Sequence, residues 1–332
     1  MSGYSGTWIM VLCVSACSSE LARHADQQPI MQQQGTELQG IVLQGAQLQG
    51  TTLQGFRFAG ATLNGAALDN LRLVKGELVA EQNQITLRGA ALVDARLLAE
   101  AQDDRVRPPQ TTLVEYQITD IVAEDPRYDP TQTGATFLYT LAQNVDNTWQ
   151  PACPVDSDGR RAAIPLASVW DERGNQRPSP SLFTFGCTTG AIAKCYRWGY
   201  RPWVTGYGNL AITHWTCTRV ARADYCGDGV SHTQNGTLIN VWDDLGAPGP
   251  IQAQGSTPPG MTFEAAWDQN GATCLSHARW SLGGSVVAAA CPNRLTPPVP
   301  GTQPGTVCDS VAEALAQGAG DAQMFDESNL SP

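Results

Sequence analysis

The sequence has few positive charges and few charged residues of any kind. Lys and Arg number 20 in 332 residues, with Lys75 and Lys194 the only lysines, against 31 Asp and Glu. Nucleic-acid binding depends on clustered Lys and Arg that neutralise phosphates, so a formal net charge of −11 excludes nucleic acid as an expected partner. Charged residues make up 15% of the chain, and together with abundant Gly and Pro this favours a turn-rich, β-leaning protein.

Several motifs that mark common metal and catalytic sites are missing as well. The cysteines include no CxxC pair of the kind that structural zinc sites use. The chain also has no GxSxG nucleophile elbow and no EF-hand pattern. The apolar stretch WIMVLCVSA at residues 8–16 is too short to span a bilayer.

That stretch has instead the length of a signal-peptide core, and it ends in small residues before Cys17. Val14-Ser15-Ala16-Cys17 resembles a bacterial lipobox, in which the cysteine is acylated and becomes the mature N-terminus. Residues 1–17 are therefore interpreted as a signal peptide with a lipobox, so Cys13 is removed and Cys17 carries lipid. An ordinary signal peptide is the alternative, because no Lys or Arg precedes Trp8. Both predict export, which permits disulfides.

A five-residue period follows a Gln-rich linker at residues 18–35. Neither a straight strand nor an α-helix keeps positions five apart on one face, whereas a chain that turns a corner in each repeat does. The pattern at residues 36–80 resembles the pentapeptide-repeat family, which implies a short right-handed β-solenoid. A low-complexity spacer is the alternative, because Gln replaces the usual Asp or Asn. The apolar centres are Leu38, Leu43, Leu48, Leu53, Phe58, Leu63, Leu68, Leu73 and Leu78.

Residues 81–310 are expected to form a β domain. Strand-like runs at 113–118 and 136–140 are rich in β-branched and aromatic residues and are bounded by Pro, Gly and Asp clusters. A short helix is predicted from Gly190 to about Trp198. Residues 311–332 are predicted to form another short helix and then a disordered acidic tail.

Eight cysteines lie in the predicted β domain. An even number in an exported chain favours four disulfides, although the spacing does not choose among the possible pairings. The even count also argues against a free thiol that could act as a nucleophile. The eight are Cys153, Cys187, Cys195, Cys217, Cys226, Cys274, Cys291 and Cys308.

The tetrapeptide Ala223-Asp224-Tyr225-Cys226 is the one that names the ADYC domain. FTFGCTTGAIAKCYRWGYRPW at residues 183–203 and FEAAWDQNGATCLSHARW at 263–280 also look like that family. Over roughly residues 80–310 the chain therefore resembles the ADYC domain family of exported myxobacterial proteins. The family has no established activity, so the resemblance implies export but no reaction.

Aromatic residues are frequent in this segment and suggest a surface for sugars. Trp198, Tyr200 and Trp203 are the candidates for such a ligand surface. Because Trp is buried on average, core packing is the alternative.

The loop at residues 224–236 is the best candidate for chemistry. Asp224 and Asp228 lie on a Gly-rich turn and could supply oxygen ligands to Ca²⁺. Catalysis would instead need His214 or His232 beside a carboxylate in an open cleft.

A structural role for the same loop is the alternative to metal binding and catalysis. In that case Asp224 makes a turn or a salt bridge with Arg219 or Arg222. Burial of Asp224 against these groups or against backbone amides would count against an enzyme.

These features predict a mainly β protein, in which a short pentapeptide-type β-solenoid continues into a disulfide-rich β domain with one or two short helices. We expect a lipoprotein of the outer membrane or cell surface that acts as a non-enzymatic binding or structural module. Its expected partners are the membrane, through lipid on Cys17, and a glycan or an envelope protein. The alternative is a hydrolase or metal-dependent enzyme that uses Asp224, Asp228 and His232.

Overall fold

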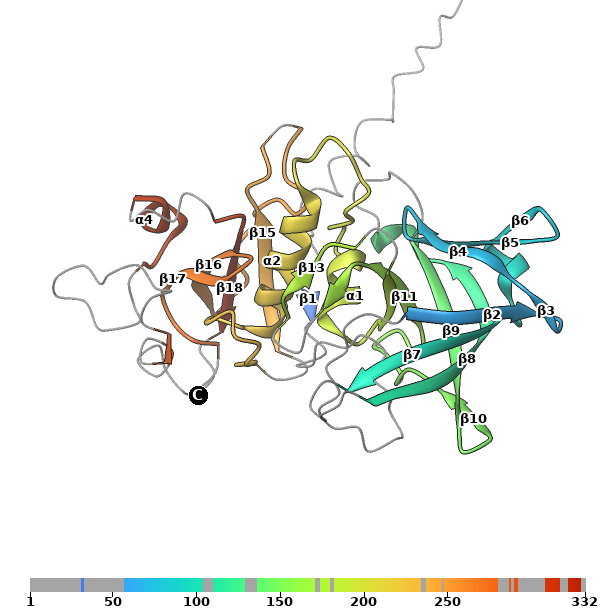
Figure 1. Ribbon diagram of the computed structural model, residues 1–332. Coiled ribbons are helices and arrows are strands. Elements are labelled where there is room, and N and C mark those ends of the chain that lie inside the picture. The colour runs from blue at the N-terminus through green and yellow to red at the C-terminus, as the bar shows by residue number, and fades with distance from the viewer. Residues whose placement is uncertain are drawn as a thin grey trace, which may run out of the picture.

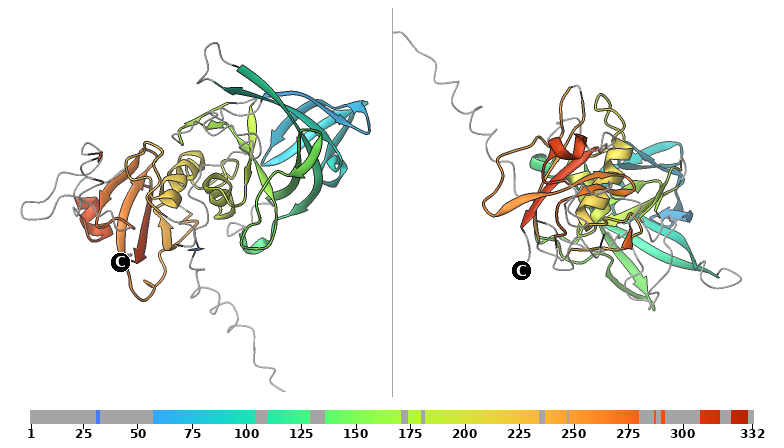
Figure 2. Two further views of the ribbon diagram at one scale, coloured as in Figure 1. Left: turned by 90° about the horizontal axis from the view of Figure 1, so that it is seen from below. Right: turned by 90° about the vertical axis from the view of Figure 1, so that its left-hand side faces the viewer.

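The computed structural model is mainly β, as the sequence predicts, and places two helices between two antiparallel sheets (Figure 1). The same order is seen from below in Figure 2. Cys17 and the repeat centres from Leu38 to Leu53 lie outside the described residues. The structure describes residues 31–32, 57–103, 110–128, 136–170, 174–179, 182–233, 237–246, 248–279, 287, 290–291, 308–316 and 322–329.

The first sheet consists of eight antiparallel strands in the order β14-β11-β9-β8-β7-β2-β3, with β10 paired to β9. Side chains alternate between its faces, so that Val114, Tyr116 and Ile118 of β8 all point into one core. The strands are β2 (Arg57–Leu63), β3 (Ala66–Ala67), β7 (Arg96–Asp103), β8 (Gln110–Ala123), β9 (Phe137–Val145), β10 (Thr148–Pro151), β11 (Ala163–Ala167) and β14 (Phe183–Cys187).

A separate three-stranded sheet packs into the same core. It consists of β4 (Asp69–Val74), β5 (Glu77–Gln82) and β6 (Ile85–Arg88). Leu78 and Ala80 of β5 are fully buried there. The backbone N–H of Leu78 donates to the Tyr139 hydroxyl at 2.9 Å, which ties this small sheet to β9.

The described part of the repeat segment forms antiparallel strands, so the solenoid expected for residues 36–80 is absent from residues 57–80. The reason is two tight turns. Asn64-Gly65 and Lys75-Gly76 have positive φ at both positions, and such two-residue turns reverse the chain instead of turning a corner. The period still predicts burial correctly, because Leu63, Leu68 and Leu78 are all in the core.

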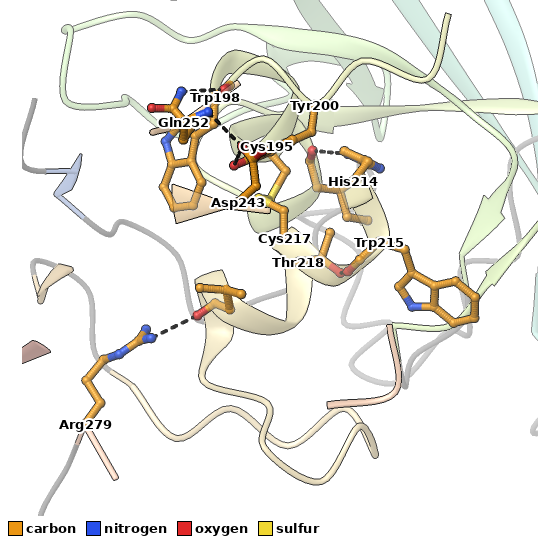
Figure 3. The surroundings of a disulfide bond; sticks show 12 residues. Cys195, Trp198, Tyr200, His214, Trp215, Cys217, Thr218, Asp243, Gln252 and Arg279 are labelled. Atoms are coloured by element: carbon orange, nitrogen blue, oxygen red, sulfur yellow. Dashed lines mark hydrogen bonds between the residues drawn. A yellow bond between two sulfur atoms is a disulfide. The ribbon is translucent and has the colours of Figure 1, made fainter. Parts of the chain in front are cut away.

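The helices between the sheets are α1 (Ala191–Arg197) and α2 (Leu210–Arg222). The prediction of a short helix beginning at Gly190 is confirmed. Its N-cap residue is Gly190, which has no side chain to cap the first turn, and the nearby Thr188 hydroxyl donates to Asp156 at 2.7 Å. A disulfide between Cys195 and Cys217 joins α1 to α2 (Figure 3). Short 3-10 turns at Gly89–Leu92 and Pro126–Tyr128 are the other helical segments before α1.

The second sheet has the order β1-β15-β18-β16-β17 and packs against α2. Its central strand, β18, comes from the C-terminal segment, in which disorder was expected for residues 317–332. That prediction is wrong for residues 324–329, because the acidic residues of β18 find partners inside the sheet. The strands are β1 (Met31–Gln32), β15 (Leu238–Asp243), β16 (Met261–Asp268), β17 (Gly271–Leu275) and β18 (Met324–Asn329).

Two small elements complete the described chain. The helix predicted after Cys308 is present as α4 (Val311–Ala316). A two-stranded ribbon, β12 (Val169–Trp170) with β13 (Gln176–Arg177), follows β11. Among the described residues no helix is both long enough and apolar enough to cross a membrane.

All eight cysteines of the β domain form disulfides, as the even count predicts. One disulfide joins the segment after β10 to the end of β14, one joins the helices, one joins the ADYC segment to a residue after β17, and one joins β17 to the segment before α4. The pairs are Cys153–Cys187, Cys195–Cys217, Cys226–Cys291 and Cys274–Cys308. Disulfides persist in oxidising compartments, so this framework indicates an extracellular or exported protein.

Candidate functional site

The ADYC loop, residues 223–233, begins where α2 ends. Ala223 has a left-handed backbone with φ of 50°, which stops the helix and turns the chain. Asp224 follows with no exposed surface. Its carboxylate accepts a hydrogen bond from Arg219 at 2.5 Å and lies 3.6 Å from Arg222. Two backbone amides, those of Asp228 and Gly229, also donate to it.

The environment of Asp224 is that of a structural carboxylate. Burial raises its pKa above the ordinary value, and the guanidinium groups of Arg219 and Arg222 offset this only in part. Arg219 and Asp224 are both almost completely buried, so no open cleft reaches the carboxylate. Asp224 therefore forms the salt bridges that the sequence offered as the alternative to metal binding and catalysis. This environment disfavours its use as a catalytic acid or base.

The second aspartate of the loop makes local turn contacts. Asp228 accepts a hydrogen bond from the backbone N–H of Val230 at 2.9 Å and donates its own N–H to Asp224. The structure therefore does not direct the two carboxylates at one shared ion. Within the described ranges, no group of three or more His, Cys, Asp or Glu side chains is placed to hold a metal.

Among the described residues, no carboxylate is hydrogen-bonded to either candidate histidine. His214 is completely buried, with Nε2 at 2.9 Å from the carbonyl oxygen of Ile192 and its ring against Trp170 and Tyr196. Burial lowers the pKa of His214 to about 4, so it is neutral at pH 7. His232 places Nδ1 3.0 Å from the carbonyl oxygen of Ala223. Both imidazoles therefore contact backbone carbonyls instead of forming a His-carboxylate pair.

A charged cluster that the sequence did not reveal lies beneath the loop. Tyr225 donates its hydroxyl hydrogen to Glu264 at 2.9 Å and stacks on Trp267 with ring centroids 5.1 Å apart. Arg279 bonds both oxygens of Glu264 at 2.9 and 3.0 Å and reaches Asp326 at 2.7 Å. All of these side chains are fully buried.

The pKa values of the two acids of this cluster shift in opposite directions. Burial opposes ionisation of Glu264, but the Arg279 guanidinium outweighs it and holds the pKa of Glu264 below the ordinary value. Burial and the adjacent Glu264 charge raise the pKa of Asp326 well above the ordinary value. The Arg279 guanidinium thus favours the ionised form of Glu264, whereas burial disfavours the ionised form of Asp326. The cluster joins β16, β18 and the segment after β17.

Two of the three aromatic ligand-surface candidates are core residues, which corrects that prediction. Tyr200 is fully buried and donates its hydroxyl hydrogen to Asp243 at 3.0 Å (Figure 3). Trp198 is 7% exposed, and its carbonyl oxygen accepts a hydrogen bond from Gln252. The alternative, core packing, is correct for these two residues, because their rings pack in the core between the helices and the second sheet. Trp203 is only half-buried.

Trp203 lines a groove of about 710 Å³ between the β4–β5 hairpin and the loop after α1. We call it the hairpin groove. Gly76 in the hairpin turn packs on the six-membered ring of Trp203 so closely that any Cβ would collide with it. The sequence points to Trp203 but not to the hairpin residues, because their proximity depends on the antiparallel turn at Lys75-Gly76.

The fold and this arrangement define a disulfide-stabilised, mainly β protein of exported type whose loop carboxylate is internal. Comparison with family models identifies an ADYC domain at residues 89–281, more than half of the chain, and eight copies of pentapeptide repeats at residues 37–75. The chain belongs to the ADYC domain family. No curated protein and no solved structure matches it.

Proposed function

We propose that this chain is a cell-envelope lipoprotein, anchored through lipid on Cys17, that works by binding and not by catalysis. The observation that carries the proposal is the environment of Asp224. A carboxylate held by Arg219, Arg222 and two backbone amides is neither accessible nor free to move a proton. The framework of four disulfides supports a rigid body built for an oxidising compartment.

The anchor is tested by comparing two cysteine variants. Cys17→Ser removes the acylated atom, so the chain should move from the membrane fraction to the soluble fraction. Cys13→Ser is the matched control, because Cys13 leaves with the signal peptide and its loss should not change the distribution. A Cys17→Ser chain that still fractionates with membranes contradicts the anchor.

The binding role is tested by thermal unfolding of the purified chain with envelope glycans, envelope extracts and Ca²⁺. A bound ligand raises the midpoint temperature in proportion to the logarithm of its concentration. A glycan or an envelope protein that raises the midpoint supports the proposal. If no ligand raises the midpoint and none is retained by the immobilised chain, the binding role is wrong and a purely architectural role replaces it.

A further inference from the structure

The hairpin groove has the size and lining of a small-molecule site. Its volume of about 710 Å³ falls in the range that holds a drug-sized ligand. Leu71 and Leu73 of β4 form one apolar wall, while Phe183 and Trp203 form the opposite one. The contact between Gly76 and the Trp203 ring holds the two walls together.

Among the residues that the structure describes, the polar rim of the groove carries two cations, of which one is paired. Glu81 accepts hydrogen bonds from Asn70 at 2.8 Å and Arg72 at 3.1 Å, and these contacts lower the pKa of Glu81 and keep it charged. Arg72 and Glu81 therefore balance each other. Lys75 lines the same groove and makes no hydrogen bond or ion pair with any residue that the structure describes.

This positive charge is unusual for the chain. Lys75 is one of two lysines, and the whole protein carries a formal charge of −11. Its position is fixed by the two-residue turn, since Lys75 and Gly76 both have positive φ. The turn thus places one cation at the rim of an apolar groove.

We propose that the hairpin groove binds an amphipathic anion, with one carboxylate or phosphate group beside Lys75 and an apolar body between the walls. The proposal rests on the binding role proposed above and names its ligand class. An apolar body matches the Leu and aromatic walls, and a single negative charge matches the single unbalanced cation.

The test is calorimetric titration of the Cys17→Ser chain with its disulfides intact, since this chain needs no detergent. The probes are dodecanoate, decanoate, dodecanol and dodecyl phosphate, each below its micelle-forming concentration. Burial of each methylene should tighten binding about fourfold, so decanoate should bind about 15-fold more weakly than dodecanoate. Dodecanol should bind about fivefold more weakly, because it lacks the charge that faces Lys75.

Three variants locate the site. Lys75→Gln should weaken dodecanoate about fivefold and remove the difference between dodecanoate and dodecanol. Arg96→Gln is the matched control, since it also removes one positive charge but lies on a separate polar cavity with Thr62 and Gln117; it should leave binding unchanged. Ser179→Trp fills the hairpin groove and should abolish binding of every probe.

The outcomes separate this inference from the broader function. Tighter binding of dodecyl phosphate than of dodecanoate identifies a lipid phosphate as the head group, and the reverse identifies a fatty carboxylate; both support the site. Failure of both anions to bind, or binding that Lys75→Gln and Ser179→Trp leave intact, overturns it. A glycan or envelope protein that binds while both amphiphiles fail overturns this inference alone.

Discussion

Replacement of Arg279 by Met tests the buried charge cluster. The guanidinium is fully buried and bonds Glu264 twice, Asp326 once and the carbonyl oxygen of Val220 at 3.1 Å. Met keeps much of the volume but leaves the Glu264 carboxylate buried without its cation. Breaking such a pair costs about 3–5 kcal/mol, which should appear as a lower free energy of unfolding in urea with all disulfides intact.

Two further results would confirm that the loss is electrostatic. Without Arg279, burial raises the pKa of Glu264 above its unfolded value, so stability is greatest below that value and falls as pH rises. The defect should therefore shrink between pH 7 and pH 5. Asp326→Asn should cost less than Arg279→Met, because burial raises the pKa of Asp326 and opposes its ionised form, and the amide keeps an oxygen that can accept a hydrogen bond. A loss below about 1 kcal/mol in Arg279→Met, or a loss in Asp326→Asn as large as that in Arg279→Met, refutes the reasoning.

Three other predictions follow from buried contacts. Burial lowers the pKa of Lys194 to about 7, so the unfolded chain binds one more proton than the folded chain between pH 7 and about 10.5. The free energy of unfolding should therefore rise over this range by up to about 1.4 kcal/mol per pH unit. Lys194→Met should lose this rise in urea melts, and an unchanged slope excludes the shift. Gly227→Ala puts a Cβ into the carbonyl oxygen of Asn270 at positive φ and should lower the free energy of unfolding by about 2–4 kcal/mol. The control Gly208→Ala has positive φ but open space and should lower it by about 1–2 kcal/mol in the same melts. Equal losses in the two variants would disprove the clash. Deletion of residues 322–332 removes β18 from the centre of its sheet. Circular dichroism should then show no cooperative unfolding of that sheet. A cooperative transition in the truncated chain would contradict the central role of β18.

Local patterns in the sequence predicted the local features well. The strand-like runs, the helix after Gly190 and the disulfide content all rest on residues close together or on simple counting. The pairing Cys226–Cys291 joins residues 65 positions apart, which spacing alone does not determine. The fold determines the partner of Cys226, and it also places the ADYC loop against the turn at Asn270-Gly271, where the Ala272 N–H donates to the carbonyl oxygen of Tyr225.

Two departures from the sequence predictions have different origins: at β18 it is pairing between distant segments, and at residues 57–80 it is local tight turns. The acidic residues of β18 suggested disorder, yet Glu327 bonds Asn240 from 87 positions away and Asp326 bonds Arg279 from 47. The repeat period suggested a solenoid, yet Asn64-Gly65 is itself a hairpin signal that could have indicated a reversal. A short pattern reports which side chains are buried but not which strand covers them.

The structural unit is longer than the matched ADYC domain. The family match covers residues 89–281, whereas β2 begins at Arg57 and pairs with β7, and β18 ends at Asn329 and pairs with β15 and β16. Expression of residues 89–281 alone would remove β2 and β3 from the first sheet, β1 and the central strand β18 from the second, and all of β4, β5 and β6. The end of the repeat match, at residue 75, lies in the turn that borders the hairpin groove, so repeat and domain share both a core and the groove.

The central claim is an exported, lipid-anchored body with all eight domain cysteines paired. Mass spectrometry of a non-reduced digest of the native membrane fraction tests it directly. The account predicts an N-terminal peptide with diacylglyceryl on Cys17, and linked peptides for Cys153–Cys187, Cys195–Cys217, Cys226–Cys291 and Cys274–Cys308. An unmodified mature N-terminus elsewhere, or free thiols among these eight cysteines, would contradict it.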